Sequence, residues 1–103
     1  MTVLDAAYLI PFKAKAWMDL TDRKAVGEHI DSKNIKKHKN DVFRLTELID
    51  TSVVIEMPGG VYKDMQKFVD RMRDESIDIK QLGLTGRTKE QILQELEELY
   101  IKQ

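Results

Sequence analysis

The chain has 103 residues, of which 42% are hydrophobic and 34% charged, and its formal net charge is −1. This length suits one domain, and the composition supports a compact core rather than a disordered chain. The absence of cysteine excludes disulfides and thiolate metal sites. No apolar run is long enough to span a membrane, and a charge near zero argues against nonspecific nucleic-acid binding. We therefore expect a soluble cytoplasmic protein without membrane association.

The N-terminal quarter of the chain predicts helix on both sides of Pro11. Asp5 can cap a short helical turn, and Pro11 fits best at the first position of a new helix because it has no amide hydrogen. One longer helix kinked at Pro11 is the alternative. Gly27 suits a left-handed C-cap at the end of this helix. The expected apolar face consists of Phe12, Ala16, Trp17 and Leu20.

A second helix is predicted from about Lys33 to Ile49, with Asp31 or Ser32 as its N-cap. Its first half is strongly basic, at the helix end where the dipole disfavours cations. Either these residues bind an anion, or the fold tolerates the electrostatic cost of placing cations at this end of the helix. The basic residues are Lys33, Lys36, Lys37, His38 and Lys39. The expected buried side consists of Ile35, Val42, Leu45, Leu48 and Ile49, with Phe43 at its edge.

The second half of the chain adds two further helices. A β-branched stretch near residues 52–57 predicts one short extended segment. Thr88 followed by Gln91 is a capping box for the last helix, whose glutamates we expect to face solvent. The third helix has the apolar positions Val61, Met65, Phe68, Val69 and Met72; the last has Ile92, Leu93, Leu96, Leu99 and Tyr100; Ile77, Ile79, Leu82 and Leu84 line the connection between them.

These patterns predict a mainly all-α fold, a four- to five-helix bundle with at most one short extended segment. We expect residues 1–103 to form a single helical domain, as the C-terminal part of a larger protein. Its helix pair 5–50 carries the chemically interesting residues, and the helices within 61–101 support them.

Two cationic side chains of the first helix have two interpretations each. Lys13 can present a point charge to a phosphate, or its ammonium can simply be solvated beside the apolar face. Arg23 can bind phosphate with two parallel hydrogen bonds, or pair with Asp19 four residues earlier. Spacing alone favours the ion pair for Arg23.

In the second helix, His38 and Asp41 share a face. A histidine oriented by a carboxylate is an element of general-base and metal sites, but two ligands do not complete a metal site, so we expect none. Asp41 also lies close to the apolar stripe, where a carboxylate needs a cationic partner. Lys37 or a lysine of the first helix can provide it, which predicts an interhelical ion pair.

Three sequence elements form a recognisable pattern: Lys13-Ala14-Lys15-Ala16-Trp17, then Arg23, then Lys37-His38-Lys39-Asn40-Asp41-Val42-Phe43-Arg44-Leu45. Together they resemble the C-terminal helical part of the abortive-infection (AbiEii/AbiGii toxin-like) nucleotidyltransferases, within the polymerase-beta-like nucleotidyltransferase superfamily. The gap between Ala16 and Arg23 is about one helical turn longer than in the family pattern. His38 stands where the pattern has its first aspartate.

The resemblance implies that Lys13 and Asp41 complete a catalytic site, and that Lys13, Arg23 and Lys37 contact nucleotide phosphates. It also implies Mg²⁺ and a nucleoside triphosphate for the complete enzyme. The Gly-Ser turn and Asp-x-Asp strand that hold them in such enzymes are absent here, and the nearest acidic pair is Glu95-x-Glu97. We therefore expect this chain to be inactive alone.

The partners that the resemblance implies are an upstream nucleotidyltransferase catalytic domain, an antitoxin protein and an RNA acceptor, with self-association through an uncovered interface. The alternative is a small helical module that binds protein or RNA without nucleotide chemistry. A helical domain that serves only as a scaffold is a third reading.

Overall fold

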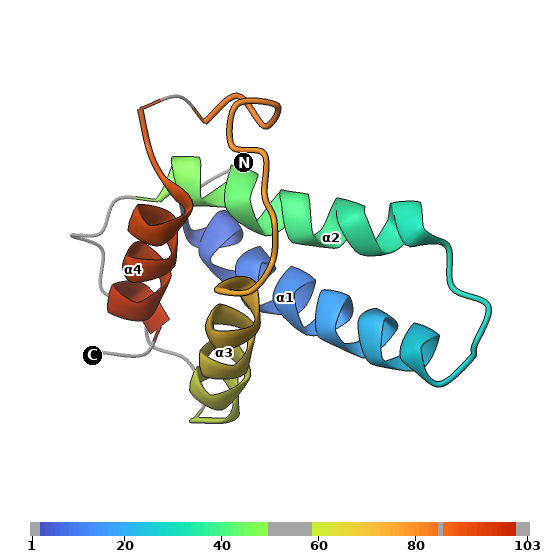
Figure 1. Cartoon of the computed structure of the whole chain (residues 1–103). Helices are drawn as coiled ribbons and strands as arrows, with labels where there is room; N and C mark the ends of the chain where they lie inside the picture. Colours follow the sequence, from blue (N-terminus) through green and yellow to red (C-terminus); the bar gives the residue numbers. More distant parts are fainter. Residues whose placement is uncertain (1–2, 50–58, 85, 101–103) are drawn as a thin grey trace.

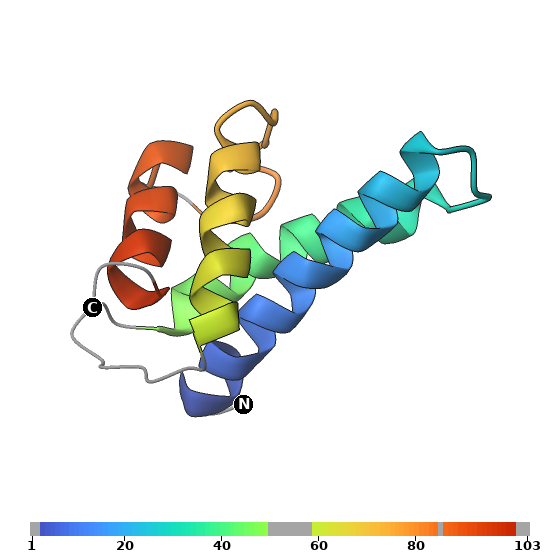
Figure 2. The same ribbon diagram turned by 90° about the horizontal axis from the view of Figure 1, so that it is seen from below.

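The computed structural model describes residues 3–49, 59–84 and 86–100. α1 and α2 form a long antiparallel hairpin, and α3 and α4 pack side by side near one end of it (Figures 1 and 2). The helices are α1 (Val3–Ala25), α2 (Ser32–Leu45), the 3₁₀ turn η1 (Thr46–Leu48), α3 (Gly59–Met72) and α4 (Lys89–Tyr100). The all-α prediction is confirmed for the described residues, whereas the extended segment expected near residues 52–57 lies outside them.

α1 runs through Pro11 without interruption, so the prediction that a new helix begins at Pro11 is wrong and the single longer helix is correct. Pro11 has no N–H to donate to the carbonyl of Ala7, its partner in a regular helix. The hydroxyl of Tyr100 donates to that carbonyl instead, at 2.6 Å. Because both residues are fully buried, this bond satisfies an acceptor that would otherwise be orphaned.

Continuity through Pro11 also changes which face of α1 is buried. The predicted face began at Phe12, but this side chain is 66% exposed. Phe12 follows Ile10 by two residues, which places it about 200° further round the helix. Ile10 is fully buried, so Phe12 must face away from the core. The buried face consists of Ala6, Ala7, Ile10, Ala14, Trp17 and Met18.

Local signals encode the turn of the hairpin as predicted. Gly27 has a positive φ of 97°, which glycine adopts without a steric penalty. Its N–H donates to the carbonyl of Lys24, and the next N–H, of Glu28, donates to the carbonyl of Arg23, both at 3.1 Å; these bonds make a Schellman motif. Asp31 then caps α2 by accepting the N–H of Lys33 at 2.9 Å.

α2 is shorter than predicted because its last turn tightens into η1. The hydroxyl of Thr46 donates to the carbonyl of Phe43 at 2.6 Å, within the buried end of the helix. The tighter turn rotates the following side chains, so Leu48 is 45% exposed rather than buried. Phe43 was expected at the edge of the buried side of α2, but its side chain is fully buried.

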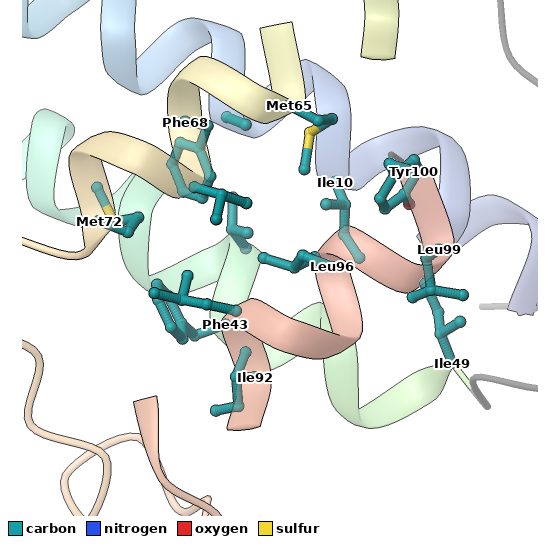
Figure 3. Packing of buried hydrophobic residues seen from close by; sticks show 14 of the residues in the cluster. Ile10, Phe43, Ile49, Met65, Phe68, Met72, Ile92, Leu96, Leu99 and Tyr100 are labelled. Carbon is teal, nitrogen blue, oxygen red and sulfur yellow. The ribbon is translucent and has the colours of Figure 1, made fainter. Parts of the chain in front are cut away.

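The core lies where α3 and α4 meet the hairpin (Figure 3). The predicted stripe of α4 is confirmed throughout, and that of α3 is confirmed except for Val61, which is only partly buried. Trp17 of α1 meets the ring of Phe68 edge-on at 5.8 Å between centroids, and the guanidinium of Arg71 lies 5.1 Å above the Trp17 ring. These contacts join α3 to the middle of α1.

The start of α4 follows its sequence signals, but its acidic face does not. The N–H of Thr88 donates to the side chain of Gln91 at 2.9 Å, and the N–H of Gln91 donates back to Thr88 at 3.2 Å, which is the predicted capping box. The glutamates were expected to face solvent. Glu97, however, is only 15% exposed and pairs with Arg73, and Glu95 pairs with Arg87. None of the described helices is both long and apolar enough to cross a membrane.

Candidate functional site

The structure brings together the two residues predicted to act in catalysis. The Lys13 ammonium of α1 lies 3.3 Å from a carboxylate oxygen of Asp41 on α2, and the side chains are 23% and 22% exposed. This is the interhelical ion pair expected for Asp41, and its cation comes from the first helix rather than from Lys37. A half-buried pair of this kind holds the lysine ammonium in one position.

His38 lies one helical turn before Asp41 on the same face of α2. Its Nδ1 atom is buried and has no hydrogen-bond partner among the described residues. Burial lowers the pKa of His38, the positive charge of Lys13 lowers it further, and Asp41 opposes the shift. Lys37 adds a smaller lowering effect. These effects favour the neutral form of the imidazole, which lies beside the Lys13–Asp41 ion pair.

The structure places one of the other two predicted phosphate ligands near the Lys13–Asp41 pair and the other far from it. Lys37 is exposed and lies four residues before Asp41, about one helical turn away on the same side of α2. Arg23 is ten residues beyond Lys13, about 15 Å further along α1. It pairs with Asp19 at 3.6 Å, as its spacing predicted, and with Glu28 at 3.0 Å. The structure thus separates Arg23 from Lys13. Both ion-pair partners of Arg23 belong to the α1–α2 hairpin.

Two exposed aromatic residues lie on a different side of α1 from Lys13, and sequence reasoning missed them. Tyr8 is 56% and Phe12 is 66% exposed. They are one turn apart on the same face of α1, and Phe12 is next to Lys13 in the chain. Exposed aromatic pairs next to charged groups are typical of surfaces that a partner covers. Their exposure follows from which residues of α1 face the core. That could be worked out only once α1 was known to continue through Pro11.

The described residues do not fit a bound metal ion. They contain no group of three or more His, Cys, Asp or Glu side chains placed to hold one. Asp41, the carboxylate at the site, is already paired with Lys13. The arrangement can bind an anion through Lys13 and can position a group next to His38, but the Mg²⁺ that the resemblance implies has no site in this part of the chain.

In comparisons with known proteins, no family model, no curated protein and no solved structure matches this chain.

Proposed function

We propose that this chain is the helical domain of a nucleotidyltransferase-like protein and that it contacts nucleotide phosphates through Lys13. The observation that carries the proposal is the half-buried ion pair of Lys13 with Asp41, beside His38 with its buried Nδ1 atom. In this arrangement Asp41 positions Lys13, and Lys13 contacts the phosphates. The metal-binding carboxylates belong to a separate catalytic domain, so this chain does not catalyse nucleotidyl transfer alone.

The ion pair leaves Lys13 able to bind an anion. A lysine ammonium has three N–H donors, and Asp41 is its only acidic partner among the described residues. The remaining donors can reach a phosphate oxygen without breaking the pair. Because Asp41 already holds the ammonium, binding costs little side-chain entropy, which is the advantage of a preorganised contact.

The exposed aromatic pair of α1 supports the presence of a covering domain. Tyr8 and Phe12 expose more than half of their surfaces, which is costly for side chains that are left in water. A catalytic domain docked over this face of α1 would bury both rings.

The test is isothermal titration calorimetry, in which ATP, GTP, CTP or UTP is titrated into the protein in the presence of Mg²⁺. It uses the 103-residue chain and the longer polypeptide in which a domain with Gly-Ser and Asp-x-Asp precedes it. We expect tight binding only by the longer polypeptide, and about tenfold weaker binding after Lys13→Gln, which matches the loss of one charge-assisted hydrogen bond. Lys15→Gln is the matched control because Lys15 is 74% exposed on another side of α1.

Three results would contradict the proposal: no upstream domain with these motifs, no triphosphate affinity in the longer polypeptide, or equal losses for Lys13→Gln and Lys15→Gln. The alternative function, a protein- or RNA-interaction module, predicts a different outcome. Strongly salt-dependent RNA binding without triphosphate affinity would favour it.

A further inference from the structure

A second candidate site lies between α2 and the segment that joins α3 to α4. This segment crosses α2 (Figure 1) and is fixed there by Lys39, whose ammonium lies 3.2 Å from Glu75 and 3.4 Å from the carbonyl of Ser76. The groove between them has a volume of about 610 Å³. Small-molecule sites in proteins have volumes of about 300–1,000 Å³.

The groove combines an apolar lining with a cationic rim. Ile77, Ile79 and Leu82 line it and are partly buried against the core. Lys36 of α2, and Lys80 and Asp78 of the crossing segment, also line it. Neither lysine has an ion-pair partner in the described part of the chain, whereas Lys39 is paired with Glu75. The two lysines outnumber the Asp78 carboxylate, so the groove keeps a net positive charge, which favours an anionic ligand with an apolar part.

Part of the backbone of the crossing segment is already hydrogen-bonded. The N–H of Gln81 donates to the Asp78 carboxylate at 3.1 Å. The next three N–H groups donate to carbonyls within the segment, those of Asp78, Ile79 and Lys80, at 3.0–3.3 Å. These four N–H groups are therefore not available to an added strand. The bonds also hold this part of the groove wall in place.

Two side-chain amides complete the lining. Asn40 lies one turn after Lys36 on α2, and Gln81 follows Lys80 on the crossing segment. A carboxamide donates and accepts hydrogen bonds at one edge, which matches the paired donors and acceptors of a nucleobase. An apolar surface, two amides and two free ammonium groups therefore lie together in one groove.

We propose that this groove binds a nucleoside phosphate, either a free nucleotide or the 5′-phosphorylated end of an RNA strand. The base lies against Ile77 and Ile79, the amides of Asn40 and Gln81 bond its edge, and the phosphate contacts Lys36 and Lys80. This site is separate from Lys13, because Lys36 and Asp41 are about 140° apart around α2. The inference does not depend on the function proposed above.

The test is an NMR titration of the ¹⁵N-labelled 103-residue chain. The probes are AMP, GMP, CMP, UMP, adenosine, inorganic phosphate, a decaglutamate peptide, and tetranucleotide RNAs with and without a 5′ phosphate. We expect nucleotides to shift the amide signals of residues 77–82 and the side-chain amides of Asn40 and Gln81. The double variant Lys36→Gln/Lys80→Gln should weaken this binding at least about tenfold.

Lys33→Gln/Lys63→Gln is the matched control, because it removes the same charge from two exposed lysines outside the groove. It should weaken binding less than about twofold, and Lys13→Gln should have no effect on the groove signals. Tighter binding of phosphorylated RNA identifies an RNA end as the ligand, and equal binding of mononucleotides identifies the free nucleotide. Equal losses in both double variants, shifts as large with inorganic phosphate alone, or tighter binding of decaglutamate would each overturn the proposal.

Discussion

Replacement of Tyr100 by Phe tests how the fold tolerates a proline inside α1. The change removes only the hydroxyl that donates to the Ala7 carbonyl at 2.6 Å and keeps the packed ring. Ala7 is fully buried, so water cannot replace the lost donor. A buried acceptor left without a partner costs about 1–3 kcal/mol. This is a large share of the stability of a small domain, which is typically about 5–15 kcal/mol.

Urea unfolding followed by far-ultraviolet circular dichroism at 25 °C measures this cost. We expect the midpoint for Tyr100→Phe to fall with an unchanged m-value, because the surface exposed on unfolding stays the same. Tyr8→Phe is the matched control, since Tyr8 is 56% exposed. It removes the same atom and should change the unfolding free energy by less than about 0.5 kcal/mol.

A second variant identifies the cause. Pro11→Ala restores the N–H that can donate to the Ala7 carbonyl, so the Tyr100 hydroxyl is no longer its sole donor. In that background Tyr100→Phe should cost at least about 1 kcal/mol less than in the natural chain. Equal costs in the two backgrounds, or a cost in the natural chain no larger than that of Tyr8→Phe, would refute the explanation.

The remaining predictions concern pH, a helix cap and the crossing segment. Because the folded chain lowers the pKa of His38, the unfolded chain binds more protons below about pH 6.5, and stability should fall as the pH drops through this value. The melting temperature should therefore fall as the pH drops, and His38→Asn should reduce that fall. An NMR titration that gives a pKa of 6.5 or above for His38 itself would contradict the argument. Thr88→Ala should cost about 1 kcal/mol in urea unfolding by removing the cap of α4; an unchanged midpoint would show that the capping box adds nothing. Lys39→Met should speed hydrogen exchange in residues 76–84 but leave α1 unchanged, because it removes the bonds to Glu75 and Ser76; unchanged exchange would show that these bonds do not hold the segment.

Elements whose signals are local in the sequence could be predicted. The C-cap at Gly27, the N-cap at Asp31 and the capping box at Thr88 each depend on residues within one turn. The apolar stripes of α3 and α4 were predicted for the same reason, since no proline interrupts either helix. These features establish the all-α fold from sequence.

Features that depend on distant contacts could not be predicted. Local rules favour a new helix at Pro11, and only the hydroxyl of Tyr100, from the other end of the chain, makes the continuous helix tolerable. The wrong start of the helix then gave the wrong buried face and hid the exposure of Phe12. At the candidate site the sequence required a cation for Asp41, but only the packing of α1 on α2 selects Lys13.

The bond between Ala7 and Tyr100 joins residues 93 positions apart, which has a consequence for the order of folding during synthesis. At about 5–20 residues per second, Tyr100 is made about 5–20 seconds after Ala7. During that interval the Ala7 carbonyl has only water as a donor, so the α1–α2 hairpin cannot bury it without cost. Arrival of the last helix both covers the core and completes the first helix, which favours one late cooperative folding step over stepwise growth from the N-terminus.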